Sequence, residues 1–369
     1  MLVISRLIFG KNVAFHVTEP LVELLLGSLE GYPDVQSDRA PDISIRFGEV
    51  GTTEPLLSRN PSTFQRFERF VITDFPHGRI SWKPSVTDRA LSIKVDFALR
   101  SLRMTYRQKF RSLEYSSEVE AFEQLLHELV LVPSMYFFSD RAVIHAAAVS
   151  VDGKAVLLTG TGGTGKTSGL LSMRHADGVE FLADDIGVLA ADGIVFPNLA
   201  WPKIYGYNLG VHVKKDELLS GRSFADRLHF NMRYKVNPAR VRRKLTAQKL
   251  FGSVSPKPVP LNTALFLFRQ NIKQMVVEDL PTSLAVEMSL AVMRTEYDHL
   301  HRFFFWDCYN SLALGRSPLL NLEDVMNNWR QTLTRIYSNA SVKIVRIPSG
   351  IGHDEYLAGI REIVITENQ

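Results

Sequence analysis

The sequence predicts an α/β protein with a smaller strand-rich N-terminal domain and a larger C-terminal domain of alternating strands and helices. Three observations carry this prediction. The first hundred residues alternate apolar and polar side chains over short segments, a capped helix start follows at 117–120, and a strand, a glycine-rich loop, a helix and a strand succeed one another from residue 144. With 369 residues the chain is long enough for two domains, which we place at 1–115 and 141–369 with a linking helix at 116–140.

Alternation with a period of two predicts strands at 43–47 and 91–97, because successive side chains of a strand point to opposite faces. The linking helix should begin at Ser117, whose hydroxyl can cap it while Glu120 stands three residues on. Apolar residues then follow at helical spacing. Pro133 cannot continue this helix without a kink, because it has no N–H and its ring clashes with the preceding turn.

The C-terminal domain begins with a predicted strand pair. Strands at 144–151 and 154–159 flank Asp152-Gly153, a dipeptide typical of tight hairpins. In chain order the pattern then predicts a glycine-rich loop, a short helix after Lys166, a strand at 179–183, a hairpin at Asp192-Gly193, a strand at 261–268, a helix at 283–301, a strand at 342–347 and a helix at 354–364.

The loop after the strand at 154–159 matches the pattern G-x-x-x-x-G-K-[ST], the Walker A motif of phosphate-binding loops (P-loops). Its glycines let backbone N–H groups wrap phosphate oxygens, Lys166 would neutralise the outer phosphates, and the Thr167 hydroxyl would bind Mg²⁺. The loop therefore predicts ATP and Mg²⁺ as cofactors, and a flexible loop without a ligand is the alternative. The residues expected to contact the nucleotide are Gly160, Thr161, Gly162, Gly163, Thr164, Gly165, Lys166, Thr167 and Ser168.

Two adjacent acids, Asp184 and Asp185, end the predicted strand at 179–183. Beside a phosphate loop, such a pair suits one carboxylate near a metal ion and one base that takes a proton from an incoming hydroxyl. The alternative is a pair of capping or turn acids. His145 lies in an apolar strand, where a lone histidine is more often a core residue. Glu296 stands among acids and histidines next to an aromatic run, where we expect core packing with a polar edge rather than metal binding.

Three motifs occur in an order and at a spacing that resemble the catalytic domain of the HPr kinase/phosphorylase family (HPr serine kinase C-terminal domain). They are Ile144-His145-Ala146, the P-loop and Leu182-Ala183-Asp184-Asp185. That family has a P-loop kinase fold related to phosphoenolpyruvate carboxykinase. The resemblance implies a serine kinase in which Asp185 is the base, Asp184 lies near the metal and His145 supports the acidic pair. This sequence has Ser168 where the family has Glu, and the resemblance does not extend to the first 115 residues.

The segment from Arg227 to Val277 contains 11 of the chain's 43 basic residues and no Asp or Glu. A surface of this kind attracts anions, so it can contact phosphates or an acidic substrate. The alternative is a solvated face that pairs with the acidic excess elsewhere in the chain, and nucleic acid is the least favoured partner. Arg240, Arg242 and Arg243 are the residues expected on the substrate side.

The single cysteine, Cys308, excludes an internal disulfide and a thiolate zinc site and favours a reducing, intracellular location. Residues 1–20 lack the apolar stretch of a signal peptide, and the longest apolar run, 129–138, is about half the ~20 residues of a membrane helix. We expect a cytoplasmic protein without a transmembrane segment, and a homo-oligomer is compatible with the sequence.

The predicted reaction is transfer of the γ-phosphate of ATP to a hydroxyl, in the first place a serine of a peptide or protein. Two alternatives stay open. A small sugar or alcohol could be the acceptor, because the same catalytic parts serve any well-placed hydroxyl, or the protein could be a nucleotide-binding regulator without transfer.

Overall fold

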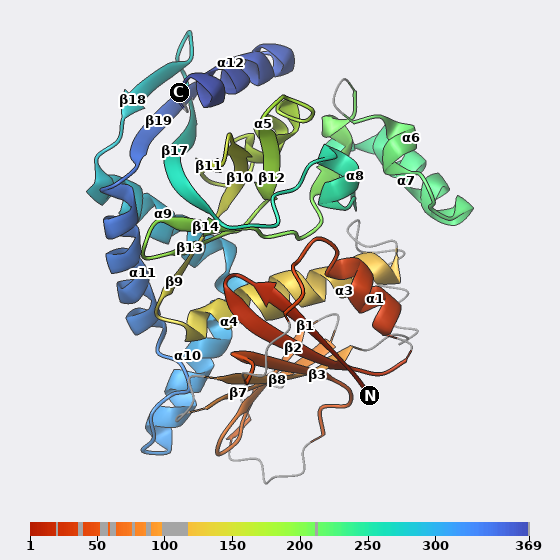
Figure 1. The fold of residues 1–369 in the computed structure, drawn as a ribbon, viewed down its shortest axis with the longest axis vertical. Coiled ribbons are helices and arrows are strands. Elements are labelled where there is room, and N and C mark those ends of the chain that lie inside the picture. Colours follow the sequence, from red (N-terminus) through yellow and green to blue (C-terminus); the bar gives the residue numbers. More distant parts are fainter. Residues whose placement is uncertain are drawn as a thin grey trace.

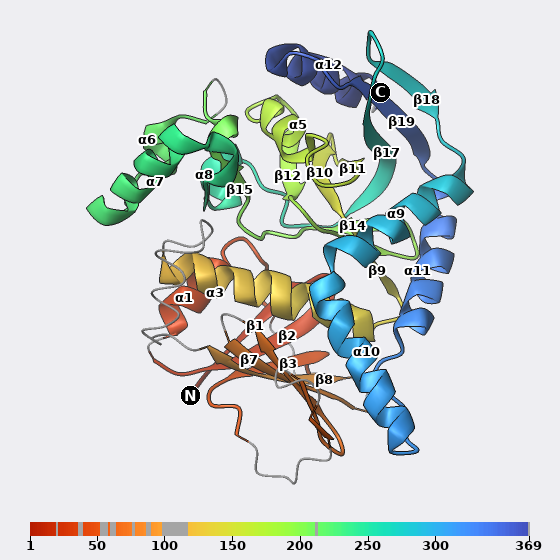
Figure 2. The same ribbon diagram turned by 180° about the vertical axis from the view of Figure 1, so that it is seen from behind.

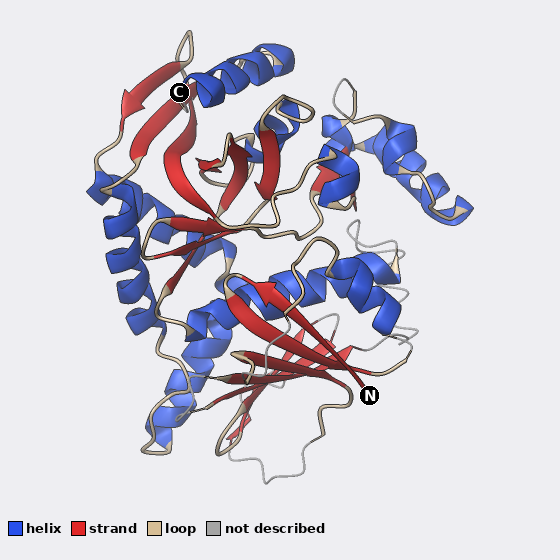
Figure 3. Cartoon of the chain, viewed as in Figure 1, coloured by secondary structure: helices blue, strands red, loops and turns tan. Residues whose placement is uncertain are grey.

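The computed structural model describes residues 1–19, 21–35, 40–51, 58–59, 64–75, 78–85, 90–97, 117–210 and 213–367. Two large sheets, with helices between and around them, form a mixed α/β structure in these ranges (Figures 1 and 3). The chain starts in the first sheet, crosses on a long helix to the second, and ends on a helix beside the second sheet. No helix in these ranges combines the length and the apolar composition that crossing a bilayer requires.

The first sheet has eight strands in the order β1-β2-β3-β8-β7-β6-β5-β4. Neighbours pair in parallel from β2 through β3 to β8, and antiparallel elsewhere. β3 and β8 coincide with the two predicted strands, and in β8 Leu91 and Ile93 are buried while Ser92 faces solvent. The strands are β1 (Leu2–Ile8), β2 (Lys11–Val17), β3 (Ile43–Phe47), β4 (Ser58–Arg59), β5 (Phe64–Arg66), β6 (Val71–Phe75), β7 (Gly78–Pro84) and β8 (Leu91–Phe97).

The linking helix lies across this sheet and begins where the sequence predicts. In α3 (Glu118–Leu126) the Ser117 hydroxyl accepts a hydrogen bond from the Glu120 N–H, as an N-cap does. Phe122 packs on Phe47 and Phe97, with ring centroids 5.5 and 5.2 Å away, so the helix and the sheet share a core. α1 (Val22–Ser28), which the strand pattern does not predict, packs beside α3 (Figure 1).

The linking helix does not stop at Pro133. It continues as a π-helical segment at 127–131 and then as α4 (Val132–Ser134), followed by a short 3-10 turn at 135–137. The Val132 N–H donates to the His127 carbonyl, five residues back, so the helix absorbs one extra residue just before the proline. The disturbance expected at Pro133 is therefore a local change of helix type rather than an end.

The second sheet has nine strands, seven of them in the order β12-β10-β11-β17-β14-β13-β9. Of the other two, β19 pairs with β17, and β18 pairs with β19. β11 and β12 span their predicted ranges, and the hairpin predicted at Asp192-Gly193 joins β13 to β14. The strand predicted at 144–151 is two strands, because the chain breaks at His145. The strands are β9 (Arg141–Ile144), β10 (Ala146–Val151), β11 (Lys154–Thr159), β12 (Val179–Ala183), β13 (Gly187–Ala190), β14 (Ile194–Phe196), β17 (Val259–Gln270), β18 (Val276–Asp279) and β19 (Ser341–Pro348). A separate ribbon pairs β15 (Lys203–Tyr205) with β16 (Arg242–Lys244).

Helices cover the second sheet, and a lobe of shorter helices, α6 to α8, stands beside it (Figure 2). The single helix predicted at 283–301 is wrong, because the chain breaks at Tyr297 into α9 and α10. α10 extends along the first sheet, so residues from the C-terminal half pack on the N-terminal strands. The sequence pattern does not predict α11. The helices are α5 (Lys166–Ser172), α6 (Lys215–Leu218), α7 (Phe224–Val236), α8 (Ala247–Phe251), α9 (Thr282–Glu296), α10 (Asp298–Ala313), α11 (Leu322–Tyr337) and α12 (His353–Thr366).

A buried ion pair ties α10 to the first sheet. Arg66 on β5 and Asp307 on α10 approach to 3.3 Å, and each side chain is 3% exposed. Asp307 also accepts a hydrogen bond from the Leu319 N–H at 2.6 Å. Burial raises the pKa of Asp307 against the opposing effect of Arg66, so the charged carboxylate depends on its partner. Around this pair, one cluster of buried apolar side chains runs from the first sheet to the second.

Replacing Arg66 with Met should lower the free energy of unfolding by about 3 kcal/mol, because a buried carboxylate loses its countercharge. The double variant R66M/D307N should recover most of this loss, since it removes both charges and keeps an acceptor for the Leu319 N–H. Urea unfolding followed by tryptophan fluorescence measures both effects. A double variant as unstable as R66M alone would contradict this account of the pair.

Candidate active site

The glycine-rich loop at 160–165 lies between β11 and α5, as the sequence predicts, and its geometry requires glycine at two positions. Gly160 has a φ of +144° and Gly165 a φ of +112°, values that residues with a Cβ rarely adopt. A Cβ on Gly165 would lie 2.5 Å from the Tyr356 hydroxyl, which donates a hydrogen bond to the Gly165 carbonyl. The loop is therefore closed against α12 and cannot accept a larger residue at 165.

Lys166 lies beneath this loop. Its ammonium donates hydrogen bonds to the carbonyl oxygens of Gly160 and Thr161, both at 2.9 Å. Burial lowers the pKa of Lys166, and the carboxylates of Asp185, Asp184 and Glu296 partly offset this effect. A phosphate group would offer the ammonium a charged partner in place of neutral carbonyls, and hydrogen bonds between charged groups are the stronger kind.

Thr167 and Asp184 form the second part of the site. The Thr167 hydroxyl donates to Asp184 Oδ1 at 2.9 Å. Burial raises the pKa of Asp184 to about 6, and the neighbouring charge of Asp185 adds to this rise. Mg²⁺ prefers oxygen ligands and is usually held by one or two protein groups together with substrate phosphates. These two oxygens fit that arrangement, and within the described ranges no group of three or more His, Cys, Asp or Glu side chains could hold a metal by itself.

Asp185 has an unusual backbone conformation. Its φ is +74°, and the Ile186 N–H donates to the Asp184 carbonyl at 3.0 Å, so Asp185 is the central residue of a strained γ-turn. The Asn198 side-chain amide donates to the Ile186 carbonyl at 2.9 Å and holds the residue after the turn. Such conformations cost on the order of 1–3 kcal/mol and persist only where the surrounding structure enforces them, often at functional sites.

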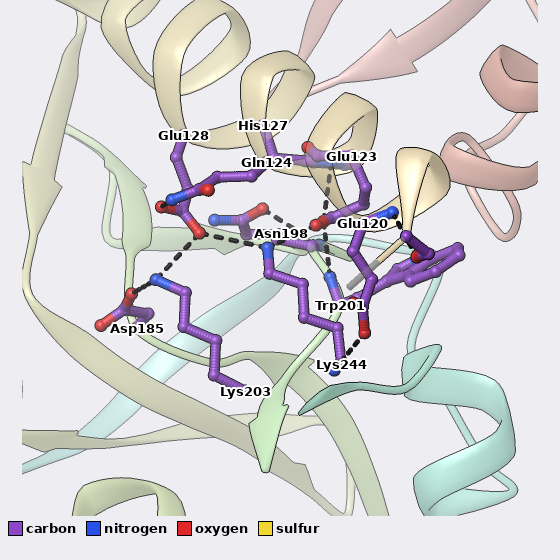
Figure 4. A network of polar contacts seen from close by, with 12 residues as sticks. Glu120, Glu123, Gln124, His127, Glu128, Asp185, Asn198, Trp201, Lys203 and Lys244 are labelled. Atoms are coloured by element: carbon purple, nitrogen blue, oxygen red, sulfur yellow. Dashed lines mark hydrogen bonds and ion pairs between the residues drawn. The ribbon is translucent and has the colours of Figure 1, made fainter. Parts of the chain in front are cut away.

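Both carboxylate oxygens of Asp185 have partners. His145 Nε2 lies 3.1 Å from Oδ1, and Lys203 Nζ lies 2.8 Å from Oδ2 (Figure 4 shows Lys203). Burial by itself would raise the pKa of Asp185, but Lys203 and His145 outweigh burial and hold this pKa well below its usual value. The two adjacent acids therefore have opposite pKa shifts, a pattern typical of carboxylates with different roles in one site.

These groups face one cavity of about 530 Å³. The structure thus brings together three parts that the sequence predicts separately: the loop, the acidic pair and His145. The predicted residues that line the cavity are His145, Gly162, Gly163, Gly165, Lys166, Thr167, Ser168, Asp184, Asp185 and Arg242. Gly160, Thr161 and Thr164 belong to the loop but do not line the cavity, and the Thr164 hydroxyl donates to the Thr161 carbonyl at 3.0 Å.

The three arginines predicted on the substrate side separate in the structure. Arg242 lines the cavity and donates to the Tyr205 hydroxyl at 2.5 Å. Arg243 is fully buried and donates to Asp226 at 2.6 Å, while Arg240 is exposed and does not line the cavity. The expectation for Arg243 is corrected: neighbouring side chains of a strand point to opposite faces, so Arg243 turns into the protein where Arg242 turns to the cavity.

The sequence pattern does not identify several other residues of the cavity wall. Arg269, from β17, lies over the Tyr356 ring at 5.1 Å and donates to the Thr164 carbonyl. Glu296, from the polar edge expected beside the aromatic run, faces His145 from the end of α9, with Oε1 3.5 Å from Nδ1. These contacts join segments far apart in the chain, and no local spacing indicates them. The remaining lining residues are Lys203, Tyr205, Tyr207, His353 and Tyr356.

Comparison with known proteins leaves the function to be inferred from these residues. No model of a known family and no curated protein matches this chain. Its structure is similar to that of the Hpr(Ser) kinase/phosphatase from Coxiella burnetii, with a TM-score of 0.26 and 13% sequence identity over 61% of this chain and 99% of that one. A TM-score this low carries no argument about activity.

Replacing Asp184 with Asn should stabilise the metal-free protein at neutral pH. The folded protein raises the pKa of Asp184 from 3.8 to about 6, so ionising this group costs about 3 kcal/mol at neutral pH. The cost is absent well below pH 3.8, where Asp184 is protonated in both states; it grows as the pH rises from 3.8 to about 6 and stays constant above that. Thermal unfolding in EDTA should therefore give a higher midpoint for D184N at about pH 7.5, and the difference should shrink as the pH falls from about 6 towards 4. A D184N midpoint at or below that of the wild type at neutral pH would contradict this account.

Proposed function

We propose that this protein is an ATP- and Mg²⁺-dependent kinase that transfers the γ-phosphate to a hydroxyl, in the first place a serine of a peptide or protein. One observation carries the proposal. A P-loop lysine, a P-loop threonine hydrogen-bonded to a buried aspartate and a second, ionised aspartate all face the same cavity. These groups correspond to the phosphate cradle, the metal site and the base that phosphoryl transfer needs.

In the proposed mechanism, the loop N–H groups and Lys166 hold the β- and γ-phosphates. Thr167 and Asp184 would hold Mg²⁺, which neutralises negative charge on the phosphates when bound. Asp185 accepts the proton of the acceptor hydroxyl while the hydroxyl oxygen forms a bond to the γ-phosphorus. The bond between the γ-phosphorus and the oxygen that joins it to the β-phosphate breaks, and ADP leaves. His145 keeps the Asp185 carboxylate in place through its 3.1 Å contact.

Two guanidinium groups on the cavity wall would oppose the negative charge of the transferred phosphate. Arg242 lies beside Tyr205, with its guanidinium carbon 5.3 Å from the ring centroid, and Arg269 lies over Tyr356 at 5.1 Å. Aromatic neighbours restrict where each guanidinium can lie. Groups held in place before the reaction stabilise developing charge without having to reorganise.

The choice of a serine acceptor rests on the resemblance of the three sequence motifs to the HPr kinase/phosphorylase family. The same catalytic groups would serve a small sugar or alcohol whose hydroxyl reaches Asp185. A regulator that only binds nucleotide has no need of a second carboxylate beside Thr167 and Asp184, so the position of Asp185 on the cavity wall favours a transferring enzyme.

Label transfer from γ-labelled ATP with Mg²⁺ into a native cell extract tests the proposal, with acid-precipitable material separated from soluble metabolites. The wild type should label a peptide or protein. D185N should bind ATP like the wild type but transfer at least about 100-fold more slowly, because it lacks the base. Label confined to a soluble metabolite would indicate a small-molecule kinase, and tight ATP binding without any transfer would contradict the kinase function.

Replacing Lys166 with Ala should abolish measurable ATP binding, because the phosphates lose their countercharge within the loop. Isothermal titration calorimetry with Mg²⁺ and ATP gives the affinity. Lys154→Ala is the matched control, because Lys154 is an exposed lysine at the start of β11, the strand before the loop, and does not line the cavity. Equal affinities of K166A and the wild type would show that the cavity is not the nucleotide site.

A further inference from the structure

Lys203 connects the proposed base to the linking helix. Its ammonium lies 2.8 Å from Asp185 Oδ2 and 2.8 Å from Glu128 Oε1, so it bridges two carboxylates (Figure 4). Lys203 is the first residue of β15, and its side chain is 17% exposed. The bridge is therefore largely enclosed, with the linking helix on one side and Asp185 on the other.

Glu128 is itself held by several neighbours. The Gln124 amide donates to Glu128 Oε2 at 2.6 Å, and Lys244 Nζ lies 3.2 Å from Oε1. Lys203 and Lys244 are paired residues of the β15–β16 ribbon, so both lysines of the ribbon reach the same acid. Glu128 lies in the π-helical segment at 127–131, and such segments occur frequently at functional sites.

The bridge between Lys203 and Asp185 opens to the cavity only on the Asp185 side, because the Asp185 side chain is 43% exposed and that of Lys203 17%. A contact of this kind fixes the orientation of the carboxylate. Orientation matters for catalysis, because a misplacement of about 1 Å can reduce a catalysed rate about 100-fold. Asp185 occupies a strained turn, and His145 contacts only one of its two carboxylate oxygens. Lys203 supplies the contact to the other oxygen.

We propose that Lys203 is a positioning residue for the Asp185 carboxylate and that Glu128, on the linking helix, holds Lys203 in place. The inference rests on the proposed kinase function, because that function makes Asp185 the base. In this assignment Lys203 acts through Asp185 rather than on the phosphates. The same helix packs on the first sheet through Phe122, so one helix contacts both the first sheet and, through Glu128 and Lys203, Asp185.

Replacing Lys203 with Met keeps most of the apolar length of the side chain and removes the ammonium. K203M should lower kcat about 100-fold and leave the KM for ATP within about twofold, because the phosphate loop is untouched. K203R should recover at least about a tenth of the wild-type kcat, because a guanidinium can also bridge two carboxylates. K343M is the matched control, since Lys343 is 23% exposed, pairs with Glu367 at 3.0 Å and does not line the cavity. It should keep the wild-type kcat.

Glu128 is tested by E128Q in the wild-type and K203M backgrounds. If Glu128 acts through Lys203, E128Q should lower kcat about tenfold in the wild type and have no further effect in K203M. Thermal unfolding of every variant separates this result from a loss of structure. A purely structural role would lower the unfolding midpoint, and its effect on activity would add to that of K203M.

Three results would overturn the positioning role: a wild-type kcat in K203M, an equal loss in K343M, or an E128Q effect that adds to that of K203M. Failure of the kinase function looks different, because the wild type would then transfer no phosphate at all. In that case a crystal structure of K203M tests the positioning role independently of activity. An Asp185 carboxylate that has moved out of contact with His145 would support the role, and a carboxylate in its wild-type position would overturn it.

Discussion

Two adjacent aspartates at the end of a buried strand impose the constraint on which the rest of the site depends. Carboxylates this close cannot both be ionised in a low-dielectric environment unless each finds its own compensation. The γ-turn at Asp185 separates them, because it sends the two side chains to different neighbours. Asp184 accepts from Thr167 and has a raised pKa, whereas Asp185 contacts Lys203 and His145 and stays charged. The strained turn thus places Asp185 beside Lys203 and His145, and these two contacts in turn stabilise the turn.

The linking helix explains part of the charge asymmetry of the chain. The basic segment from Arg227 to Val277 contains no acid, and two of its buried cations pair with acids outside it. Arg243 pairs with Asp226, one residue before the segment, and Lys244 pairs with Glu123 and Glu128 of the linking helix (Figure 4). Arg242 and Arg269 of the same segment line the cavity instead. The paired cations are buried rather than on a solvated face, and contact of Arg242 and Arg269 with an anion stays a prediction.

Features that depend on neighbours within a few residues could be predicted from the sequence. The N-cap at Ser117, the hairpin at Asp192-Gly193 and the place of the glycine-rich loop between β11 and α5 belong to this class. The break at His145 does not, since it occurs where the chain changes partners: β9 pairs with β13, whereas β10 pairs with β11 and β12. Lys203 likewise reaches Asp185 only through tertiary pairing, which one sequence does not specify. The domain boundaries, the acceptor and self-association stay predictions.

The π-helical segment determines how the linking helix can vary in length. Each residue added to or removed from an α-helix rotates everything beyond it by about 100°. A change of one residue between Ser117 and Glu128 would therefore turn Glu128 away from Lys203 or turn Phe122 out of the first sheet. The π turn closes between His127 and Val132 and already contains one surplus residue. The part of the helix from Ser117 to Glu128 therefore has a fixed length, and the surplus residue belongs to the π turn that contains Glu128.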